Sequence, residues 1–422
     1  MEIFQNPNFV KLFLAALASQ MGSTIGNMAF AFYLLDRFGH KPYYTTVAEL
    51  MYSLPTIFVF FIVGVIADRF DRKKIAENCD WIRAFITVLL FAALFTDNLP
   101  LIFFILFLRS AVTKFFYPAE SSLVQAILRK DQYAQASGLN QMLFSIFLVF
   151  GVGLGAIAYR TIGIQGAVLV DLVSFVLSAL FIRSCNISKE ARLPNGSGKW
   201  RDLDITSAFC DFMEGIRYIL SNRLLTLIVF GFFLFGFFQG CFAVLPMFTM
   251  KYELAPESYE TYSSILSMFL GSGLLAGSGI SSVIARKIKP FTMLIVPIFL
   301  DSVLVLFLGL ADQVKTYLPI IFFLGMCIGP INVAIGGWIP KIVDPKLMGR
   351  VSGWVDPLMM FAQSITLLFV AVLYPRIIRD IDVLYYGIAL IILFVFLFYA
   401  IFMPKHLNER EEQTETKKVQ IL

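Results

Sequence analysis

The chain has 422 residues, of which 58% are hydrophobic and 15% are charged, and its mean hydropathy is +0.78. Soluble globular proteins carry a charge on about 25% of their residues, so this composition excludes an ordinary water-soluble domain and indicates an integral membrane protein. The net charge of +5 does not point to nucleic acid, because topology sets the placement of Lys and Arg in membrane proteins. The five cysteines and two histidines show neither a CxxC pair nor the spacing of metal ligands, so we expect no disulfide framework, no metal site and no cofactor.

Apolar runs long enough to cross a ~30 Å hydrocarbon layer as helices recur along the chain. We expect twelve membrane spans, at residues 10–35, 45–67, 75–95, 99–119, 137–159, 164–183, 223–248, 262–285, 291–311, 317–338, 350–373 and 383–403. The first run continues to Leu35, which is the length of a span rather than of a cleaved signal peptide. A polar segment from Ser184 to Asn222 separates the sixth span from the seventh. The sequence therefore predicts an all-α membrane protein with two pseudo-symmetric six-helix bundles.

Basic residues predict the orientation of these spans, because cytoplasmic loops carry an excess of Lys and Arg. When the loops are assigned alternately to the two sides, most Lys and Arg residues outside the spans fall on the side that holds both termini. The other side carries Arg37, Lys41, Arg160, Lys251, Lys315, Arg376 and Arg379. We therefore expect a cell-membrane protein with both termini in the cytoplasm. Its predicted domains are an N-terminal bundle (1–183), a cytoplasmic linker (184–222), a C-terminal bundle (223–403) and a cytoplasmic tail (404–422).

The loop between the second and third spans carries a dense basic motif, Gly64-Val-Ile-Ala-Asp-Arg-Phe-Asp-Arg-Lys-Lys74. The corresponding place after the eighth span holds Gly279-Ile-Ser-Ser-Val-Ile-Ala-Arg-Lys-Ile-Lys289, which lacks the aspartate. Such an internal sequence repeat is typical of transporters built from repeated helix bundles. Asp68 can face the start of span eleven, where unpaired amides after Gly349 favour a carboxylate. The alternative is a basic loop that only sets topology.

This motif, Gly64-x-x-x-Asp68-Arg69-x-x-Arg72-Lys73-Lys74, resembles the loop 2–3 signature of the major facilitator superfamily. Asp71 stands where that family usually has glycine, a departure that looks like the macrolide-efflux branch of proton-coupled drug exporters. Further motifs similar to that branch are Asp80-x-x-Arg83-Ala84, Leu108-Arg109-Ser110, Pro118-Ala119, Asp171-x-x-Ser174-Phe175, Gly271-x-Gly273-x-x-x-Gly277 and Met348-Gly349-Arg350-Val351. The resemblance spans residues 9–403. It implies the major facilitator fold and a cytoplasmic latch, closed in the outward-open state and broken in the inward-open state. The latch residues are Gly64, Asp68, Arg69, Arg72 and Lys73.

Ionisable residues inside the spans mark candidate sites, because each costs at least about 2.5–3.5 kcal/mol at the bilayer centre unless it faces protein or water. Arg109 lies deep in span four, and by resemblance it occupies the position of an arginine associated with proton coupling in exporters. Its alternative role is structural, as a buried arginine that holds neighbouring helices together. Asp80 and Arg83 are three residues apart on one helix face, so we expect them to form a local structural pair.

Carboxylates inside the spans are the candidate proton carriers, because a buried carboxylate without a partner can take up and release a proton. Asp171 and Asp301 have no basic neighbour in sequence. We expect Asp301 first and Asp356 second to carry the proton, with Asp171 as a further candidate. Asp356 precedes a proline and has an alternative role at a helix kink. Glu49 and Glu120 lie near span ends and are expected to reach water.

The 45 Phe and 15 Met residues supply soft apolar surface that tolerates bulky amphiphilic ligands. The polar residues expected to line the cavity are Gln20, Asn27, Asn140, Gln141, Gln239, Asn332 and Gln363. The alternative for each of them is an interhelical hydrogen bond. Gly151-x-Gly153-x-Gly155 in span five resembles an exporter motif without its proline, and it is expected to let helices approach closely.

These features predict a secondary transporter that exports a hydrophobic or amphiphilic small molecule by proton antiport with alternating access. Alternatives of the same class are a lysophospholipid or lipid flippase and a siderophore exporter. An enzyme is not expected, because the chain has no HExxH motif, Walker loop or intramembrane His-Asp cluster. The loop signature disfavours a receptor or scaffold. The expected partners are the substrate, protons and membrane lipid, not nucleic acid, and the chain is expected to act as a monomer.

Overall fold

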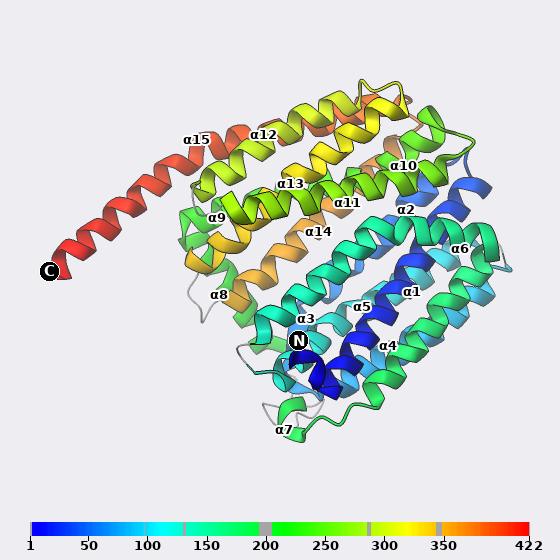
Figure 1. The fold of residues 1–422 in the computed structure, drawn as a ribbon, viewed down its shortest axis with the longest axis horizontal. Coiled ribbons are helices and arrows are strands. Elements are labelled where there is room, and N and C mark those ends of the chain that lie inside the picture. Colours follow the sequence, from blue (N-terminus) through cyan, green and yellow to red (C-terminus); the bar gives the residue numbers. More distant parts are fainter. Residues whose placement is uncertain are drawn as a thin grey trace. The chain divides into compact units, whose positions relative to one another are not determined.

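The computed structural model describes residues 2–421 except 97, 130–131, 194–204, 285–287 and 343–347. Every regular element within those residues is a helix, as Figure 1 shows, so the prediction of an all-α chain is confirmed. The elements are η1 (Glu2–Gln5), α1 (Pro7–Arg37), α2 (Tyr43–Ser53), α3 (Pro55–Arg69), α4 (Arg72–Ala93), α5 (Leu99–Ile127), α6 (Tyr133–Arg183), α7 (Lys189–Arg192), α8 (Ile205–Ser221), α9 (Arg223–Phe242), α10 (Leu245–Thr249), η4 (Met250–Leu254), α11 (Tyr259–Ile284), α12 (Pro290–Leu308), α13 (Val314–Ile342), α14 (Met348–Leu373) and α15 (Ile381–Ile421).

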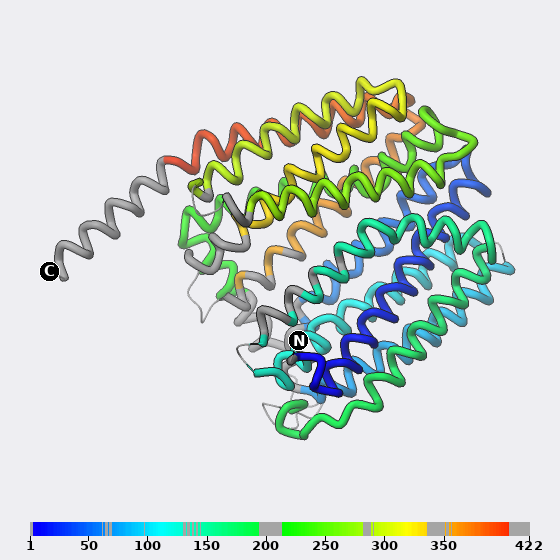
Figure 2. Tube along the Cα trace, in the orientation of Figure 1, coloured from blue at the N-terminus to red at the C-terminus, as the bar shows by residue number. Residues whose placement is uncertain are grey.

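Three of these helices, α2, α3 and α6, do not correspond to single predicted spans. The predicted second span is divided into α2 and α3 at Leu54, because Pro55 has no backbone N–H with which to continue the helical ladder. The predicted fifth and sixth spans are the two legs of α6, which meet at Gly163 with φ 69° and ψ −178°. Glycine alone adopts that conformation easily. Figure 2 shows the chain reversing its direction there, so the legs run antiparallel.

The chain divides into two compact units. Unit 1 contains residues 1–209 and 250–268, and unit 2 contains residues 210–249 and 269–422. The short segment 250–268 comes from the second half of the sequence but packs within unit 1. This division follows packing alone, so the predicted domain boundaries at 183 and 223 stay a prediction.

Within unit 1, α1 packs along α6, and α4 packs against α5 and α6. The first contact depends on small residues. A Cβ atom at Gly151 would overlap the side chain of Thr24, and one at Gly155 would overlap Met28. Glycine lets helix backbones approach closely in membranes. The role expected for this glycine motif is therefore confirmed.

Within unit 2, α9 packs against α14 and α15, and α12 packs against α13 and α15. Glycines again bring backbones together, here between α11 and α13. A Cβ atom at Gly273 would overlap the carbonyl oxygen of Phe322, and one at Gly277 would overlap that of Met326. Both glycines belong to the predicted Gly271-x-Gly273-x-x-x-Gly277 motif, which thus lies at a helix-helix contact.

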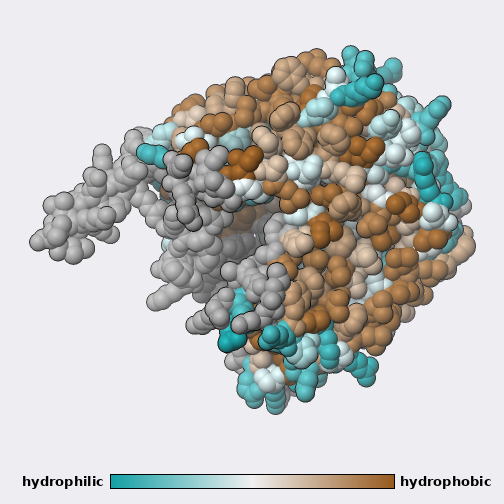
Figure 3. Space-filling model, in the orientation of Figure 1, coloured by the Kyte–Doolittle hydropathy of each residue, from teal (hydrophilic) through white to brown (hydrophobic). Residues whose placement is uncertain are grey.

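The surfaces of these helices suit a lipid environment. Among the described residues, eight helices are long and apolar enough to cross a membrane by length and composition. One of the eight, Ser145–Arg183, includes the predicted sixth span and part of the fifth. The predicted second span is interrupted between α2 and α3, the third, α4, carries several charges, and the apolar part of α14 is the shorter stretch Pro357–Leu373. Large hydrophobic side chains such as Phe85, Leu390 and Ile401 stay exposed. Figure 3 shows hydrophobic side chains along the visible helices and hydrophilic ones gathered near helix ends. The protein is therefore a multi-pass membrane protein.

Candidate functional site

A buried ion pair links two helices inside unit 1. Arg109 of α5 is 6% exposed, and its guanidinium donates to the carboxylate of Asp171 on α6, which is fully buried. The Nη2 atom of Arg109 also donates to Oδ1 of Asn27 on α1, at 2.6 Å. Three helices therefore converge on one guanidinium. The expectation that Asp171 is without a basic partner is wrong, because a residue 62 positions away in the chain supplies it.

Glycines of α1 make the room for this pair. A Cβ atom at Gly26 would lie 3.1 Å from Oδ2 of Asp171, and one at Gly22 would overlap the Ser174 hydroxyl. The Ser23 hydroxyl of α1 also hydrogen-bonds Asp171. The other carboxylate oxygen of Asp171, Oδ1, has no hydrogen-bond partner among the described residues. One oxygen is thus paired with a cation, while the other is open to a further proton.

Helix α2 adds two residues that the sequence did not single out for this site. Tyr52 lies in the electrostatic field of Arg109, Asp171 and Glu49. Its backbone carbonyl accepts a hydrogen bond from the hydroxyl of Ser110 at 2.8 Å, which ties α2 to α5 beside Arg109. Glu49 was expected to reach water at a span end, yet it lies close enough to act on this cluster. A regular helical count along span two would have placed Glu49 and Tyr52 near one face.

Glu120 is 5% exposed, so the expectation that it reaches water is wrong. Helix α5 continues to Ile127, beyond the predicted end of span four at residue 119, and it keeps Glu120 inside unit 1. The carboxylate therefore belongs to the interior of the helix packing rather than to a loop.

A second buried pair in unit 1 confirms the expected local pairing of Asp80 and Arg83. Asp80 is 0% and Arg83 is 1% exposed. The guanidinium carbon of Arg83 lies 4.5 Å from the ring centre of Phe116 and 4.4 Å from that of Phe175. Its Nη2 atom donates to Ser19 at 3.0 Å. Both carboxylate oxygens of Asp80 accept hydrogen bonds, whereas Nε of Arg83 has no hydrogen-bond partner among the described residues. The contacts of this pair with neighbouring helices fit a structural role.

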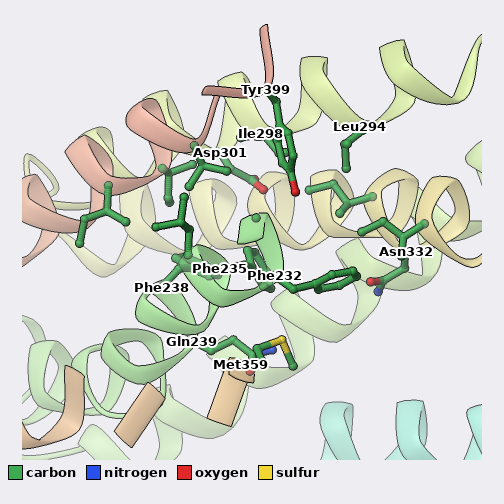
Figure 4. A pocket seen from close by; sticks show the side chains of 17 residues that line it. Phe232, Phe235, Phe238, Gln239, Leu294, Ile298, Asp301, Asn332, Met359 and Tyr399 are labelled. Carbon is green, nitrogen blue, oxygen red and sulfur yellow. The ribbon is translucent and has the colours of Figure 1, made fainter. Parts of the chain in front are cut away.

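Unit 2 contains a cavity of about 140 Å³ between α9, α12, α13, α14 and α15, which Figure 4 shows. Asp301 of α12 is 3% exposed and lines it, and its Oδ1 atom has no hydrogen-bond partner among the described residues. The Cys327 thiol of α13 hydrogen-bonds this carboxylate. A water needs roughly 10–15 Å³ of such space, so the cavity has room for several waters or a small organic group.

The polar residues predicted to line one cavity are found in both units. Asn27 joins Arg109 in unit 1, whereas Gln239 and Asn332 line the Asp301 cavity in unit 2. Gln20 and Gln363 are half-buried, and Asn140 is exposed. The side chains of Gln141 and of the predicted proton carrier Asp356 lie outside those the structure describes.

The predicted latch is described in part. Asp71 caps α4, and its Oδ1 atom accepts from the backbone N–H of Lys73 at 3.0 Å and of Lys74 at 3.3 Å. An aspartate at the usual glycine position therefore begins the third span. The Lys73 ammonium donates to the carbonyls of Arg183, at 2.8 Å, and Cys185, at 2.7 Å.

Arg72 takes part in a contact as well, while the surroundings of Gly64, Asp68 and Arg69 lie outside the described residues. The latch itself stays a prediction.

Comparison with known proteins agrees with this architecture. A model of the Major Facilitator Superfamily matches residues 12–367. The MFS-type transporter YkuC of Bacillus subtilis (strain 168) is 64% identical, over 96% of this chain and 94% of that protein. Macrolide efflux protein A of Streptococcus pyogenes is 23% identical, over 87% of this chain and 90% of that protein. A mutant of the peptide transporter POT in complex with alafosfalin has a similar fold, with a TM-score of 0.74 at 11% identity over 94% of both chains.

Proposed function

The chain belongs to the major facilitator superfamily, and we propose that it exports a hydrophobic or amphiphilic small molecule in exchange for protons, by alternating access. The observation that carries the proposal is the buried Arg109–Asp171 pair, which Asn27 joins to a third helix. Similarity to macrolide efflux protein A supports a drug-like cargo. Intramembrane charges of this kind are retained at ion and substrate pathways because they are costly elsewhere.

Proton binding at Asp171 has a direct mechanical consequence. A proton on the carboxylate cancels its charge and removes the Coulomb attraction that holds Arg109 against α6. Because Arg109 also holds α1 through Asn27, the contacts between three helices change together. The proton enters from the outer side and leaves to the cytoplasm. Its entry at about 150 mV supplies roughly 3.5 kcal/mol, which can drive a gradient of a few hundredfold.

Further residues take part in the proposed transport cycle. Asp301 and Asp356 are further proton carriers in the second half of the chain. Gly64, Asp68, Arg69, Arg72 and Lys73 form the cytoplasmic latch that opens and closes during transport. The protein acts as a monomer in the cell membrane, with both termini in the cytoplasm.

Substrate-dependent proton release from proteoliposomes of known orientation tests the proposal. The candidate substrates are a macrolide, a lipophilic cation and a lysolipid. We expect proton counterflow with one of the drugs, at least tenfold lower in Arg109→Ala and Asp171→Asn. Lys315→Ala is the control, because it removes an exposed charge at the start of α13. Lysolipid movement without a proton signal would instead make the protein a flippase and Arg109 a structural residue.

A further inference from the structure

The carboxylate of Asp301 is buried without a balancing charge. It is 3% exposed, and none of the ion pairs among the described residues includes it. Its Oδ1 atom also lacks a hydrogen-bond partner there. An isolated buried carboxylate costs several kcal/mol, and either a bound proton or a positive partner offsets that cost. The side chain lies on the wall of a cavity, so such a partner has room to bind.

The third span of each half carries a buried aspartate, and the two aspartates differ in their neighbours. Asp80 lies on α4, the third span of the first half, and the guanidinium of Arg83 sits next to it between two aromatic rings. Asp301 lies on α12, the third span of the second half. Three residues further along stands Leu304, where α4 has its arginine. The built-in cation of unit 1 is therefore missing from α12.

The walls of the cavity are suited to a cation from outside the chain. Phe232, Phe235 and Phe238 of α9 and Tyr399 of α15 contribute aromatic surface. The Tyr399 hydroxyl donates to the backbone carbonyl of Ile228 at 3.2 Å, so its lone pairs remain as acceptors. Figure 4 shows the oxygen atoms of Asp301 and Tyr399 directed into the same space. A carboxylate, a phenol acceptor and ring faces together favour a positive group over a neutral or negative one.

We infer that this cavity within unit 2 binds the ammonium or guanidinium group of a small organic cation, with Asp301 as its counter-ion. The aromatic rings of α9 and Tyr399 hold the adjoining apolar part of the ligand. The assignment of that ligand as cargo rests on the proposed export function. Binding itself can be measured without transport or a proton gradient, and all the residues that line the cavity belong to unit 2.

Binding of hexylammonium to the purified full-length protein in detergent tests this assignment, with hexanol and hexanoate as neutral and negative probes of the same chain length. Calorimetric titration is expected to give at least tenfold tighter binding of hexylammonium than of hexanol, and no binding of hexanoate. Asp301→Asn should weaken hexylammonium at least tenfold and leave hexanol unchanged. The unchanged hexanol affinity shows that the variant is folded.

Two further variants sharpen the test. A Cβ atom at Gly231 would overlap the Tyr399 hydroxyl, so Gly231→Ala should push this ring into the cavity and weaken both probes. Asp382→Asn removes a carboxylate from α15 outside the cavity and should change neither. Equal affinity of the wild-type protein for hexylammonium and hexanol, or an unchanged affinity in Asp301→Asn, would overturn the inference. If proteoliposomes show no antiport while hexylammonium still binds through Asp301, the coupling proposal fails and the cation site stands.

Discussion

The guanidinium of Arg83 contacts groups from several helices, in addition to its partner Asp80 on the same helix. Asp80, Ser19 and two phenyl rings surround it, and Ser178 donates to the second oxygen of Asp80 at 2.5 Å. These groups come from α1, α4, α5 and α6. A charge pair in contact with four helices fixes how these helices pack, whereas the pair alone contributes little net stability once desolvation is counted.

Removing only one member of this pair should be strongly destabilising. We expect Arg83→Met to lower the free energy of unfolding by about 3–5 kcal/mol, because Asp80 then stays buried without a counter-charge. The double variant Asp80→Asn, Arg83→Met leaves no buried charge and should recover most of this loss. Thermal unfolding in detergent compares the two proteins. A double variant no more stable than Arg83→Met would contradict the charge argument.

The two arginine pairs differ in how far sequence reasoning could reach. Asp80 and Arg83 are three positions apart, and helical periodicity alone places them on one face. Arg109 and Asp171 are 62 positions apart, and their meeting depends on the close approach of α1, α5 and α6. Periodicity along one helix carries no information about that approach. The sequence therefore marked both residues as costly but could not pair them.

Gly163 turns one long helix into two membrane legs. It has φ 69° and ψ −178°, and the nearest atom to an added Cβ would be Oε1 of Gln165 at 3.5 Å. We expect Gly163→Ala to destabilise the protein by about 1–3 kcal/mol, through backbone strain without a clash. Gly387 is the matched control, because it lies in α15 with nothing within 4 Å of an added Cβ. Gly387→Ala should stabilise by roughly 0.5–1 kcal/mol, and thermal unfolding distinguishes the signs. Equal shifts for both variants would contradict a special conformation at Gly163.

Helix positions were largely predictable because apolar runs of spanning length have few alternatives in a membrane. The breaks within these helices were harder to predict from the sequence. The predicted second span ran through Pro55 without a break, although a proline there ends the ladder of α2. The turn at Gly163 falls in the gap between the predicted spans 137–159 and 164–183. An apolar run shows only that a segment is hydrophobic enough to be a span. A break in a helix depends on the backbone conformation at one residue.

On the scale of the whole molecule, one segment departs from the order of the chain. Residues 250–268 belong to unit 1, where Asp36 of α1 accepts from the Lys251 ammonium at 3.0 Å and from the Tyr259 hydroxyl at 2.6 Å. Arg160 of α6 pairs with Glu260. These partners are 100 or more positions apart in sequence. A division at the central polar segment could not reveal them, because it considers hydropathy and not contacts.

Membrane orientation is the property of the whole chain that basic residues predict most directly, and it can be tested at two exposed positions. Asp312 lies between α12 and α13, on the predicted outer side, and Lys189 lies in the predicted cytoplasmic segment. Four of the five native cysteines, Cys79, Cys185, Cys241 and Cys327, are buried and should give little background. The fifth, Cys210, is replaced by serine in both variants, so that labelling reports on the introduced thiol. We expect a membrane-impermeant maleimide to label Asp312→Cys in intact cells and to label Lys189→Cys only after lysis. The reason is that Lys and Arg-rich loops remain in the cytoplasm during insertion. The opposite labelling would place the Lys73 and Lys74 loop outside, where a cytoplasmic latch could not operate.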